Sequence, residues 1–535
     1  CLTALSNEEA EKEAVDGPLW YLRYPLAGGG HVTVATTRPE TMLGDTAVAV
    51  HPEDERYRAL IGRRLRLPVV DREIPVIGDE AVDPGFGSGA VKVTPAHDPA
   101  DFEIGRRHDL PSIDVMTPDA RIGQAAPERF QGLDRYEARR AVVAEFEAAG
   151  LLEKVEPHRH AVGHCYRCHT VVEPRLSDQW FVRMAPLAKP ALEAYRDGTL
   201  KFIPERRGED YAAWLEGIRD WCISRQLWWG HRIPVWYCET GGCGLTSVSR
   251  DDLLVCPACG GEVRQDEDVL DTWFSSWLVP FSSLGWPERT RDLTRFYPGH
   301  TIVSAPEIIF FWVSRMLMAG LHFMGEVPYT RIYLHGTVRD TQHRKMSKSL
   351  GNGIDPLDVI ALYGADALRW TVVAGLGMGT DVILDPKDLE KSFAPGRNFV
   401  TKLWNIGRFL LQNIGDHTPP ALANVDPESL LPADAWILSR LDAAIGECDA
   451  ALGQARPAAD AWPVDERNRG LRLDEYAESA RRFAWNELAD WYVEAVKTRL
   501  QSTDADGDVA RAVLVHVFDH ALRLLHPIVP FITET

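Results

Sequence analysis

Positive charge is scarce in this sequence. Its 535 residues include 58 lysines and arginines but 78 aspartates and glutamates, which gives a net charge of −20. This balance excludes nonspecific polyanion binding over the whole surface, but it leaves room for local basic patches. Two candidate patches stand out by their spacing: Arg331, Arg339, Arg344, Lys345 and Lys348, and further on Arg397, Lys402 and Arg408. Charge alone therefore does not decide whether the protein binds nucleic acid.

A clean membrane-spanning run is also lacking. The nearest one, at 308–324, contains Arg315 and His322 and is short for a bilayer, which favours a buried core helix. The first residues carry no signal-peptide pattern, because acidic side chains follow from Glu8. Apolar residues make up 45% and charged residues 25%, as in ordinary soluble proteins. We expect a cytoplasmic, monomeric protein of roughly three or four domains with no membrane partner.

Nine cysteines, mostly in close pairs, suggest metal sites in a reducing compartment and not a disulfide framework. Four of them form a Cys-x4-Cys-x12-Cys-x2-Cys array with flanking glycines, namely Cys238, Cys243, Cys256 and Cys259. This closed spacing predicts a structural zinc, with a reduced, metal-free knuckle as the alternative. Cys165 and Cys168 supply half of a second site. The isolated Cys222 and Cys448 are interpreted as packing residues.

The pattern of apolar residues divides the chain into a β-rich start and a helical end. Short strands are expected at 20–26 and 31–37, joined by a turn at Gly28-Gly29-Gly30, and at 67–70, 74–77 and 90–93. A helix is expected over 135–149, with Gly150 as its stop. From residue 394 onward the pattern is helical, with amphipathic stretches at 400–411, 433–452, 473–500 and 509–525. A polar loop at 453–470 interrupts them and is interpreted as an insertion.

One short polar run, KMSKS at 345–349, carries two lysines and two serines after an apolar stretch. Flexible ammonium groups suit negative charge that develops during a reaction, as on a departing pyrophosphate. A solvated basic loop is the alternative for an isolated Lys-x-x-Lys. The whole run, however, resembles the signature loop of class I aminoacyl-tRNA synthetases. The resemblance implies that Lys345 and Lys348 are catalytic and that ATP, a substrate bound with Mg2+, is held by Lys345, Met346, Ser347, Lys348 and Ser349.

Four further segments extend this resemblance over nearly the whole chain. They are TTRPETMLGDTAVAVHP at 36–52, KVTPAHDPADF at 92–102, WCISRQLWWG at 221–230 and DTWFSS at 271–276. The first two are similar to the editing domain of valyl-tRNA synthetases, and the last also favours that branch. The resemblance implies ATP-dependent attachment of valine to its tRNA through valyl-adenylate, with hydrolytic editing of mischarged threonyl-tRNA. Valine, ATP and the tRNA specific for valine are the implied partners.

The resemblance also assigns residues to two pockets. Trp273 and Trp312 would form the amino-acid pocket, although both could be plain core tryptophans. Glu307, where these enzymes commonly have aspartate, is implied as a further residue of the amino-acid pocket. An apolar pocket cannot strongly reject threonine, a limit for which valyl enzymes are themselves the usual example, so a second, hydrolytic site is needed. Its implied residues are Arg38, Thr41, Phe86, Lys92, Thr94, Asp98 for the substrate ammonium, and Asp101 for the threonine hydroxyl.

Asp98 and Asp101 also allow a simpler interpretation, since a pair of carboxylates on a loop usually belongs to a turn or a helix cap. Cys1 is a candidate third ligand beside Cys165 and Cys168, because similar enzymes often carry a Cys-x2-Cys at that point.

The same resemblance predicts an α/β multidomain protein: the C-terminal half of a class I Rossmann-type catalytic domain, an inserted β-barrel-like editing domain and an α-helical-bundle anticodon-binding domain. The expected parts are a zinc-bearing connection (1–15), the editing domain (16–157), a return connection (158–215), the second catalytic half (216–328) with the knuckle (238–260), the KMSKS and stem-contact region (329–393) and the helical domain (394–535).

A second ATP-binding signature of class I enzymes, the HIGH-type motif, does not occur in these 535 residues. We interpret the sequence as a fragment that lacks the HIGH-containing half and the C-terminal coiled coil of such enzymes. Two alternatives are an editing-only deacylase and a tRNA-binding remnant without ligase activity. The presence of a HIGH motif in the reading frame upstream of Cys1 would decide between them.

The missing motif leads to a first prediction. This chain expressed by itself should not form valyl-adenylate, because half of the expected ATP site is absent. The measurement is valine-dependent exchange of labelled pyrophosphate into ATP. Exchange at a rate near that of full-length valyl-tRNA synthetases would contradict the prediction.

Overall fold

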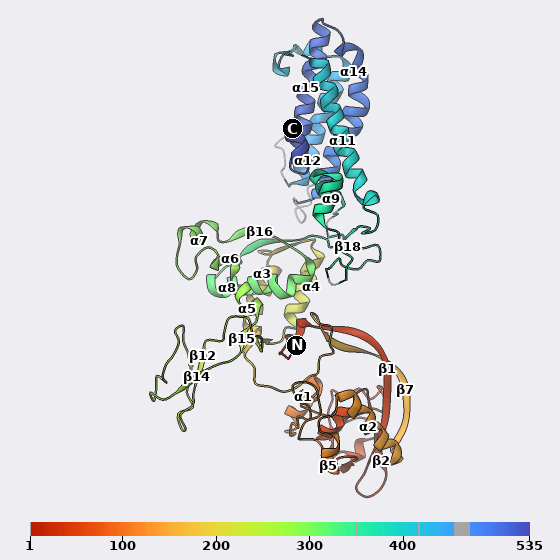
Figure 1. The fold of residues 1–535 in the computed structure, drawn as a ribbon, viewed down its shortest axis with the longest axis vertical. Helices are drawn as coiled ribbons and strands as arrows, with labels where there is room; N and C mark the ends of the chain where they lie inside the picture. The colour runs from red at the N-terminus through yellow and green to blue at the C-terminus, as the bar shows by residue number, and fades with distance from the viewer. Residues whose placement is uncertain (1, 349, 376, 378, 416–417, 454–470) are drawn as a thin grey trace. The chain divides into compact units, whose positions relative to one another are not determined.

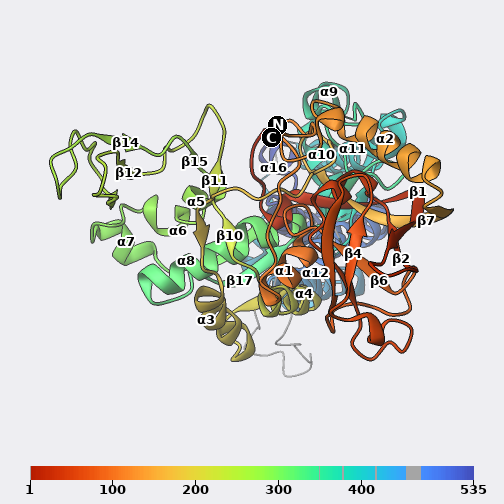
Figure 2. The same ribbon diagram turned by 90° about the horizontal axis from the view of Figure 1, so that it is seen from below.

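The computed structural model describes residues 2–348, 350–375, 377, 379–415, 418–453 and 471–535. It forms two compact units, each built from two stretches of chain (Figures 1 and 2). The first contains Cys1–Met184 and Arg219–Ser275, and the second contains Ala185–Ile218 and Ser276–Thr535. Among the predicted features, Cys1, Ser349 and all of the proposed insertion except Gly453 lie outside the described residues.

A long antiparallel ribbon runs through the first unit. Strand β1 (Ala10–Pro25) pairs with β2 (His31–Thr36) on one side and with β7 (Leu152–Cys165) on the other. The predicted hairpin is confirmed, with Trp20 opposite Thr36. Its three turn glycines have φ between 85° and 109°, a region that side chains other than glycine rarely adopt. The ribbon reaches back to Ala10, opposite Cys165, which the sequence pattern did not indicate.

A second sheet in this unit has the order β4-β5-β3-β6, formed by Arg64–Leu67, Arg72–Gly78, Ala47–Val50 and Ala90–Val93. The strands predicted at 74–77 and 90–93 are confirmed. The strand predicted at 67–70 is wrong beyond Leu67, because Val69 and Asp71 adopt positive φ in a turn. Helices α1 (Pro99–Arg107) and α2 (Arg135–Ala148) pack in the same part of the first unit as this sheet. As predicted, α2 ends just before Gly150.

The remainder of the first unit consists of short strand pairs. One three-stranded sheet, with order β13-β12-β14, comprises Thr246–Val248, Val235–Cys238 and Val263–Gln265. Two-stranded pairs join β8 (Phe181–Val182) to β10 (Trp221–Cys222), and β11 (Ser224–Arg225) to β15 (Val269–Leu270). Buried Arg225 bridges Glu9 and Asp271 at 2.8 Å each, so this region is tied to the start of the chain.

A parallel three-stranded sheet with the order β16-β17-β9 forms the α/β part of the second unit. Its strands are Gly299–Ser304, Tyr329–Leu334 and Lys201–Ile203. Helix α8 (Ser314–Met324) and the turns before it connect β16 to β17, while α3 (Ala185–Arg196) and α4 (Arg206–Glu216) flank β9. The parallel βαβ arrangement agrees with half of a Rossmann-type domain. The third strand, β9, falls in the segment that we predicted as a connection.

The apolar run at 308–324 is a core element, as predicted. Within the part of the chain that the structure describes, one helical run, Pro306–Met324, is long and apolar enough to cross a membrane. Residues 313–320 of this run are buried, including the Arg315 side chain, which is 1% exposed. Since the run also links two strands of the parallel sheet, we assign it to the protein core.

Apart from the parallel pair β18 (Val338–Arg339) and β19 (Val382–Ile383), the rest of the second unit is mostly helical, and its long helices surround a large apolar core. Its long helices are α11 (Leu389–Ile414), α12 (Pro432–Ala451) and α15 (Ala505–Leu525), and a continuous run covers 473–500. The predicted helical bundle is therefore confirmed. Helix α11 begins eleven residues before the predicted stretch at 400, and a π-helical segment, Phe483–Tyr492, interrupts the run at 473–500. The shorter helices in this part are α9 (Pro356–Tyr363), α10 (Ala365–Gly375), α13 (Leu473–Arg482), α14 (Val493–Leu500) and α16 (Pro530–Glu534).

Candidate functional site

A buried polar cluster lies beside strand β6 in the first unit. The Lys92 ammonium donates hydrogen bonds to the hydroxyls of Thr41 and Thr94, at 2.8 and 2.7 Å. All three side chains are among the buried polar residues. Lys92 and Thr94 are two positions apart, so a strand presents them on the same face. Three residues predicted for the hydrolytic site are thus in direct contact.

Asp45 completes this cluster and was missed as a site residue. Its carboxylate accepts a hydrogen bond from the Thr94 hydroxyl at 2.5 Å and from the Tyr24 hydroxyl at 2.7 Å, and it lies 3.6 Å from the Lys92 ammonium. Burial raises the pKa of Asp45, while the Lys92 charge opposes the shift. An aspartate two residues before the fully apolar strand β3 was the available signal, since buried carboxylates need partners.

Asp98 and Asp101 lie at the beginning of helix α1, next to the cluster. Asp98 is the N-cap residue and accepts hydrogen bonds from the backbone N–H groups of Ala100 and Asp101, at 2.8 and 3.2 Å. The simpler alternative, a helix cap, therefore holds for Asp98, but its side chain is only half-buried and can also meet a ligand. Asp101 is buried and accepts from the Thr94 N–H at 2.8 Å.

Burial raises the pKa of Asp101 to about 7, with Lys92 opposing and Asp98 reinforcing the shift. This carboxyl is therefore partly protonated near neutral pH. In that state it can both donate a hydrogen bond to a substrate hydroxyl and accept one from it. The position fits recognition of a hydroxyl better than that of a permanent charge.

The raised pKa of Asp101 gives a prediction for stability. An ordinary value near 3.8 in the unfolded chain and about 7 in the folded chain means that the folded state binds the proton more tightly. The contribution of this bound proton to the free energy of unfolding is full below pH 4 and is lost as the pH rises through 7. Asp101→Asn should therefore gain stability relative to wild type between pH 4 and 8, by at most about 4 kcal/mol. Urea unfolding at each pH measures this, with exposed Asp83→Asn as the control; parallel pH profiles for wild type and Asp101→Asn would refute it.

Arg38 and Phe86, the other predicted residues of this site, differ in their surroundings. The Arg38 guanidinium donates to the His97 carbonyl at 2.7 Å and pairs with Glu173, and the Thr41 hydroxyl donates to the Arg38 carbonyl at 3.0 Å. Phe86 is 47% exposed and contacts the edge of His158, with ring centroids 5.5 Å apart. Arg38 is thus connected to the polar cluster, while Phe86 lies at the surface.

The predicted KMSKS loop belongs to the second unit and is held at its base. Buried Asn352 donates to the Asp340 carboxylate at 2.9 Å and accepts from the Ser347 N–H at 2.9 Å. The Asn352 amide, together with Arg344, holds the pKa of Asp340 well below its usual range. The Lys345 ammonium pairs with Glu307, a predicted amino-acid-pocket residue. Exposed pairs of this kind contribute at most about 1 kcal/mol, so a phosphate could replace the carboxylate.

The two tryptophans predicted for the amino-acid pocket belong to different units, Trp273 to the first and Trp312 to the second. Trp273 is the second residue of helix α5 (Thr272–Ser276), and its backbone N–H donates to the Asp271 carboxylate at 3.1 Å. Trp312 donates its indole N–H to the Ser276 carbonyl at 2.9 Å. Both are half-buried. Their roles in an amino-acid pocket remain predictions.

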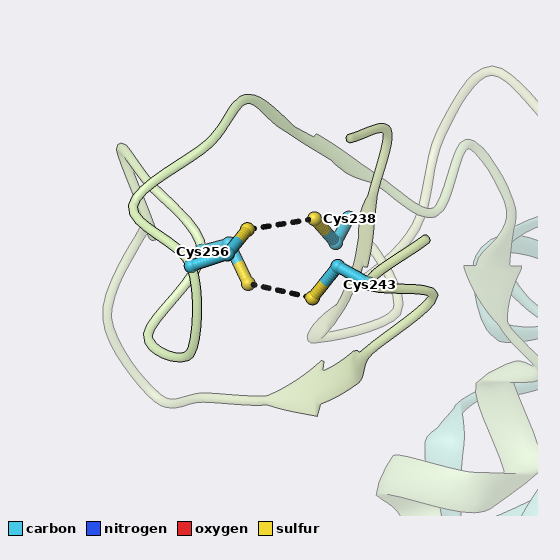
Figure 3. A group of neighbouring side chains, drawn as sticks. Cys238, Cys243 and Cys256 are labelled. Carbon is cyan, nitrogen blue, oxygen red and sulfur yellow. Dashed lines mark hydrogen bonds between the residues drawn. The ribbon is translucent and has the colours of Figure 1, made fainter. Parts of the chain in front are cut away.

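The four cysteines of the knuckle come together at the end of strand β12, whose last residue is Cys238. Figure 3 labels three of them, Cys238, Cys243 and Cys256. All four sulfur atoms lie within 4.8 Å of one another, with Cys238–Cys259 at 3.5 Å and Cys243–Cys256 at 3.8 Å. Four thiolates at ~2.3 Å from a central zinc are ~3.8 Å apart, so the donor set fits tetrahedral coordination. The Gly261 N–H and the Cys238 thiol lower the pKa of Cys259 to about 6, whereas the neighbouring thiols raise the pKa of Cys243 to about 12, so four thiolates would need a bound cation between them.

The second predicted metal site is less complete. Cys165 ends strand β7 and is buried, while exposed Cys168 lies 3.4 Å from the Thr170 hydroxyl. Among the described residues, the knuckle cysteines are the one group of three or more metal-ligating side chains found together. Cys1, the proposed third ligand, is outside those residues. The isolated Cys222 and Cys448 are buried, consistent with packing roles.

Comparison with known proteins supports the resemblance seen in the sequence. A sequence model of the family "tRNA synthetases class I (I, L, M and V)" matches residues 1–385, and one of the "anticodon-binding domain of tRNA ligase" matches residues 464–535. Valine–tRNA ligases of Carboxydothermus hydrogenoformans and Thermotoga maritima are 53% and 50% identical to the whole chain. The chain spans 58% of the length of each of these relatives.

Solved structures agree at the level of the fold. Mycobacterium tuberculosis methionyl-tRNA synthetase in complex with methionyl-adenylate matches 70% of this chain, and 65% of its own, with a TM-score of 0.51 and 18% identity. The predicted fold class, a class I catalytic part joined to a helical anticodon-binding part, is thereby confirmed, as is the similarity to valyl enzymes. The chain belongs to the class I tRNA synthetases of the I, L, M and V group.

Proposed function

We propose that this chain forms part of an enzyme that attaches valine to its tRNA at the expense of ATP, and that its first unit hydrolyses mischarged threonyl-tRNA. The relatives named valine–tRNA ligase, about half identical over the whole chain, support the first part. The observation that carries the second part is the buried cluster of Lys92, Thr41, Thr94 and Asp45 directly beside Asp98 and Asp101.

Hydrolytic selectivity would arise from the position of the two carboxylates. Half-buried Asp98 would pair with the substrate ammonium, which threonine and valine share. Buried Asp101 would hydrogen-bond the hydroxyl that threonine alone carries. Valine would leave this polar group without its partner, at a cost of ~1–3 kcal/mol. The Lys92 cluster would hold Asp101 in place through Thr94. The Thr94 backbone N–H donates to Asp101, while the Thr94 hydroxyl accepts from Lys92 and donates to Asp45.

For the ligation step, Lys345 and Lys348 would stabilise charge on the departing pyrophosphate, and the helical part would contact tRNA. Trp273, Trp312 and Glu307 would shape the amino-acid pocket. A structural zinc would be held by Cys238, Cys243, Cys256 and Cys259. This closed thiolate site offers no open position for catalysis and would stabilise the knuckle alone.

Asp101 gives a prediction specific to hydrolytic selectivity. Asp101→Ala should still cleave threonyl-tRNA slowly but lose most of its preference over valyl-tRNA, because the hydroxyl is no longer recognised. A loss of ~1–3 kcal/mol corresponds to a roughly 5- to 150-fold fall in the threonine-to-valine rate ratio. Parallel hydrolysis assays with both charged tRNAs measure this ratio. An unchanged ratio would contradict the assignment of Asp101.

Ligation and hydrolysis can be tested together in a chimera that joins this chain to the HIGH-containing part of a valine–tRNA ligase relative. The chimera should charge the tRNA with valine and accumulate no threonyl-tRNA. Lys348→Ala should lower valine-dependent pyrophosphate exchange by roughly 10²-fold, as for loss of one transition-state donor. Asp98→Ala should leave that exchange unchanged but allow threonyl-tRNA to accumulate. A correctly folded chimera that charges no valine would refute the ligation proposal.

A further inference from the structure

Three consecutive residues after strand β7 lie against the candidate hydrolytic site, although they fall outside the predicted editing domain (16–157). We call residues 173–175 the strap. Glu173 pairs with Arg38, the Pro174 carbonyl lies 3.3 Å from His97 Nδ1, and Arg175 Nε donates to Asp114 at 3.0 Å. Glu173 and Pro174 therefore contact Arg38 and His97 directly, and Arg175 contacts Asp114, which lies 3.5 Å from His97 Nε2.

Pro174 contacts His97, the residue before Asp98, directly, and Glu173 reaches it through Arg38. The Val115 N–H donates to His97 Nε2 at 2.9 Å, so this nitrogen is an acceptor and Nδ1–H is left to donate to the Pro174 carbonyl. The ring is fully buried, and burial lowers its pKa to about 4, so it is neutral at physiological pH. The backbone carbonyl of His97 accepts from Arg38 at 2.7 Å. His97 is thus held through its ring by the strap and through its carbonyl by Arg38.

Arg38 in turn is held in a small network of partly buried charges around fully buried Glu40. Glu173 contacts both Arg38 and Arg135, the latter at 2.8 Å. Arg38 Nε lies 3.6 Å from fully buried Glu40, which forms two 2.7 Å hydrogen bonds with Arg139. If Glu173 loses its charge, Arg38 keeps only the more distant carboxylate. The orientation of Arg38 therefore depends on the strap.

We propose that Glu173 is a positioning residue of the hydrolytic site and that the strap belongs to this site. It acts through a chain of contacts: Glu173 orients Arg38, Arg38 and Pro174 fix His97, and the His97–Asp98 peptide places the Asp98 carboxylate that would anchor the substrate ammonium. The inference rests on the proposed hydrolytic function. It moves the functional boundary of the editing domain from residue 157 to at least residue 175.

The test is hydrolysis of threonyl-tRNA specific for valine by the whole chain carrying Glu173→Gln, which keeps the shape and removes the charge. A shift of ~1 Å in an anchoring group can cost ~10² in rate. We expect kcat to fall at least tenfold, with KM changed less than threefold because the rest of the tRNA is bound elsewhere. Glu156→Gln is the matched control, since Glu156 is also ion-paired, to Lys154, but is exposed on β7.

A double variant separates positioning through Arg38 from other effects. If Glu173 acts through Arg38, adding Glu173→Gln to Arg38→Ala should lower kcat less than twofold further, whereas independent effects would multiply. Multiplying effects, or a folded Glu173→Gln protein with a kcat within twofold of wild type, would overturn the proposal. A wild-type chain that hydrolyses no threonyl-tRNA would instead refute the proposed function.

In that last case, hydrogen exchange of the peptide covering residues 97–101 decides whether the strap holds Asp98. Glu173→Gln should increase its exchange rate at least tenfold, and Glu156→Gln should not. Equal exchange rates in wild type and Glu173→Gln would overturn the strap inference on structural grounds alone.

Discussion

Replacing Asp98 by alanine should nearly abolish the hydrolysis of threonyl-tRNA, with a fall in rate of roughly 30- to 5000-fold. The substrate ammonium would lose its charged partner, and truncating one member of a desolvated ion pair costs ~2–5 kcal/mol. Asp98 also caps helix α1, and losing a cap costs ~1 kcal/mol of stability. Two different losses are therefore combined in the alanine variant.

Asp98→Asn separates these two losses, because asparagine caps a helix about as well as aspartate but carries no charge. The asparagine variant should unfold like wild type and hydrolyse as poorly as the alanine variant. The measurement is a deacylation time course for all three proteins, with urea unfolding in parallel. Normal hydrolysis by Asp98→Asn would show that the carboxylate is a cap and nothing more.

Loss of the knuckle cysteines should have the second large effect. Protein purified without added metal should contain about one zinc per chain, because the four sulfur atoms are already placed for tetrahedral coordination. The double variant Cys256→Ser, Cys259→Ser should retain at most the partial zinc occupancy of the second pair, Cys165 and Cys168. Its knuckle should also become protease-sensitive, since binding free energy at such a site is folding free energy.

Cys168→Ser is the matched control for the zinc measurement, because it removes a thiol from the incomplete second pair. Its zinc content should fall by no more than the partial occupancy that two thiols allow. Elemental analysis of the three proteins gives the answer. An unchanged metal content in the double variant would exclude the knuckle as the zinc site.

Elements with strong local signals could be predicted from the sequence. The β1–β2 hairpin follows from three consecutive glycines between alternating strands, and helix α2 from its apolar spacing and Gly150. The strand error at 67–70 has a local cause: Val69 adopts positive φ, which its β-branched side chain disfavours and which composition does not reveal. Helix α11 begins before residue 400 and contains Pro395, a residue that normally signals a helix boundary.

Pairings between distant segments could not be predicted. Strand β9 has three residues and joins the parallel sheet only through β17, which lies more than 120 residues later. The first nine positions of β1 pair with the end of β7, and neither segment shows clear alternation by itself. Such strands are defined by their partners and not by their own composition.

The same distinction applies to the candidate site. Arg38, Thr41, Lys92 and Thr94 were identified because they lie in two motifs of a known family, and the structure brings them close together. Asp45 lies in the first motif but was not recognised, because its role depends on Tyr24 and Thr94 across the fold. Glu173 lies outside both motifs, and only its contact with Arg38 reveals it.

The central claim is that the first unit distinguishes threonine from valine on the same tRNA. The most direct test is a time course in which the unmodified chain hydrolyses the threonyl and valyl forms of the tRNA specific for valine, side by side. We expect the threonyl ester to be cleaved roughly 5- to 150-fold faster, because valine leaves one buried polar group unpaired. Equal rates for the two esters, or hydrolysis of both no faster than without protein, would contradict it.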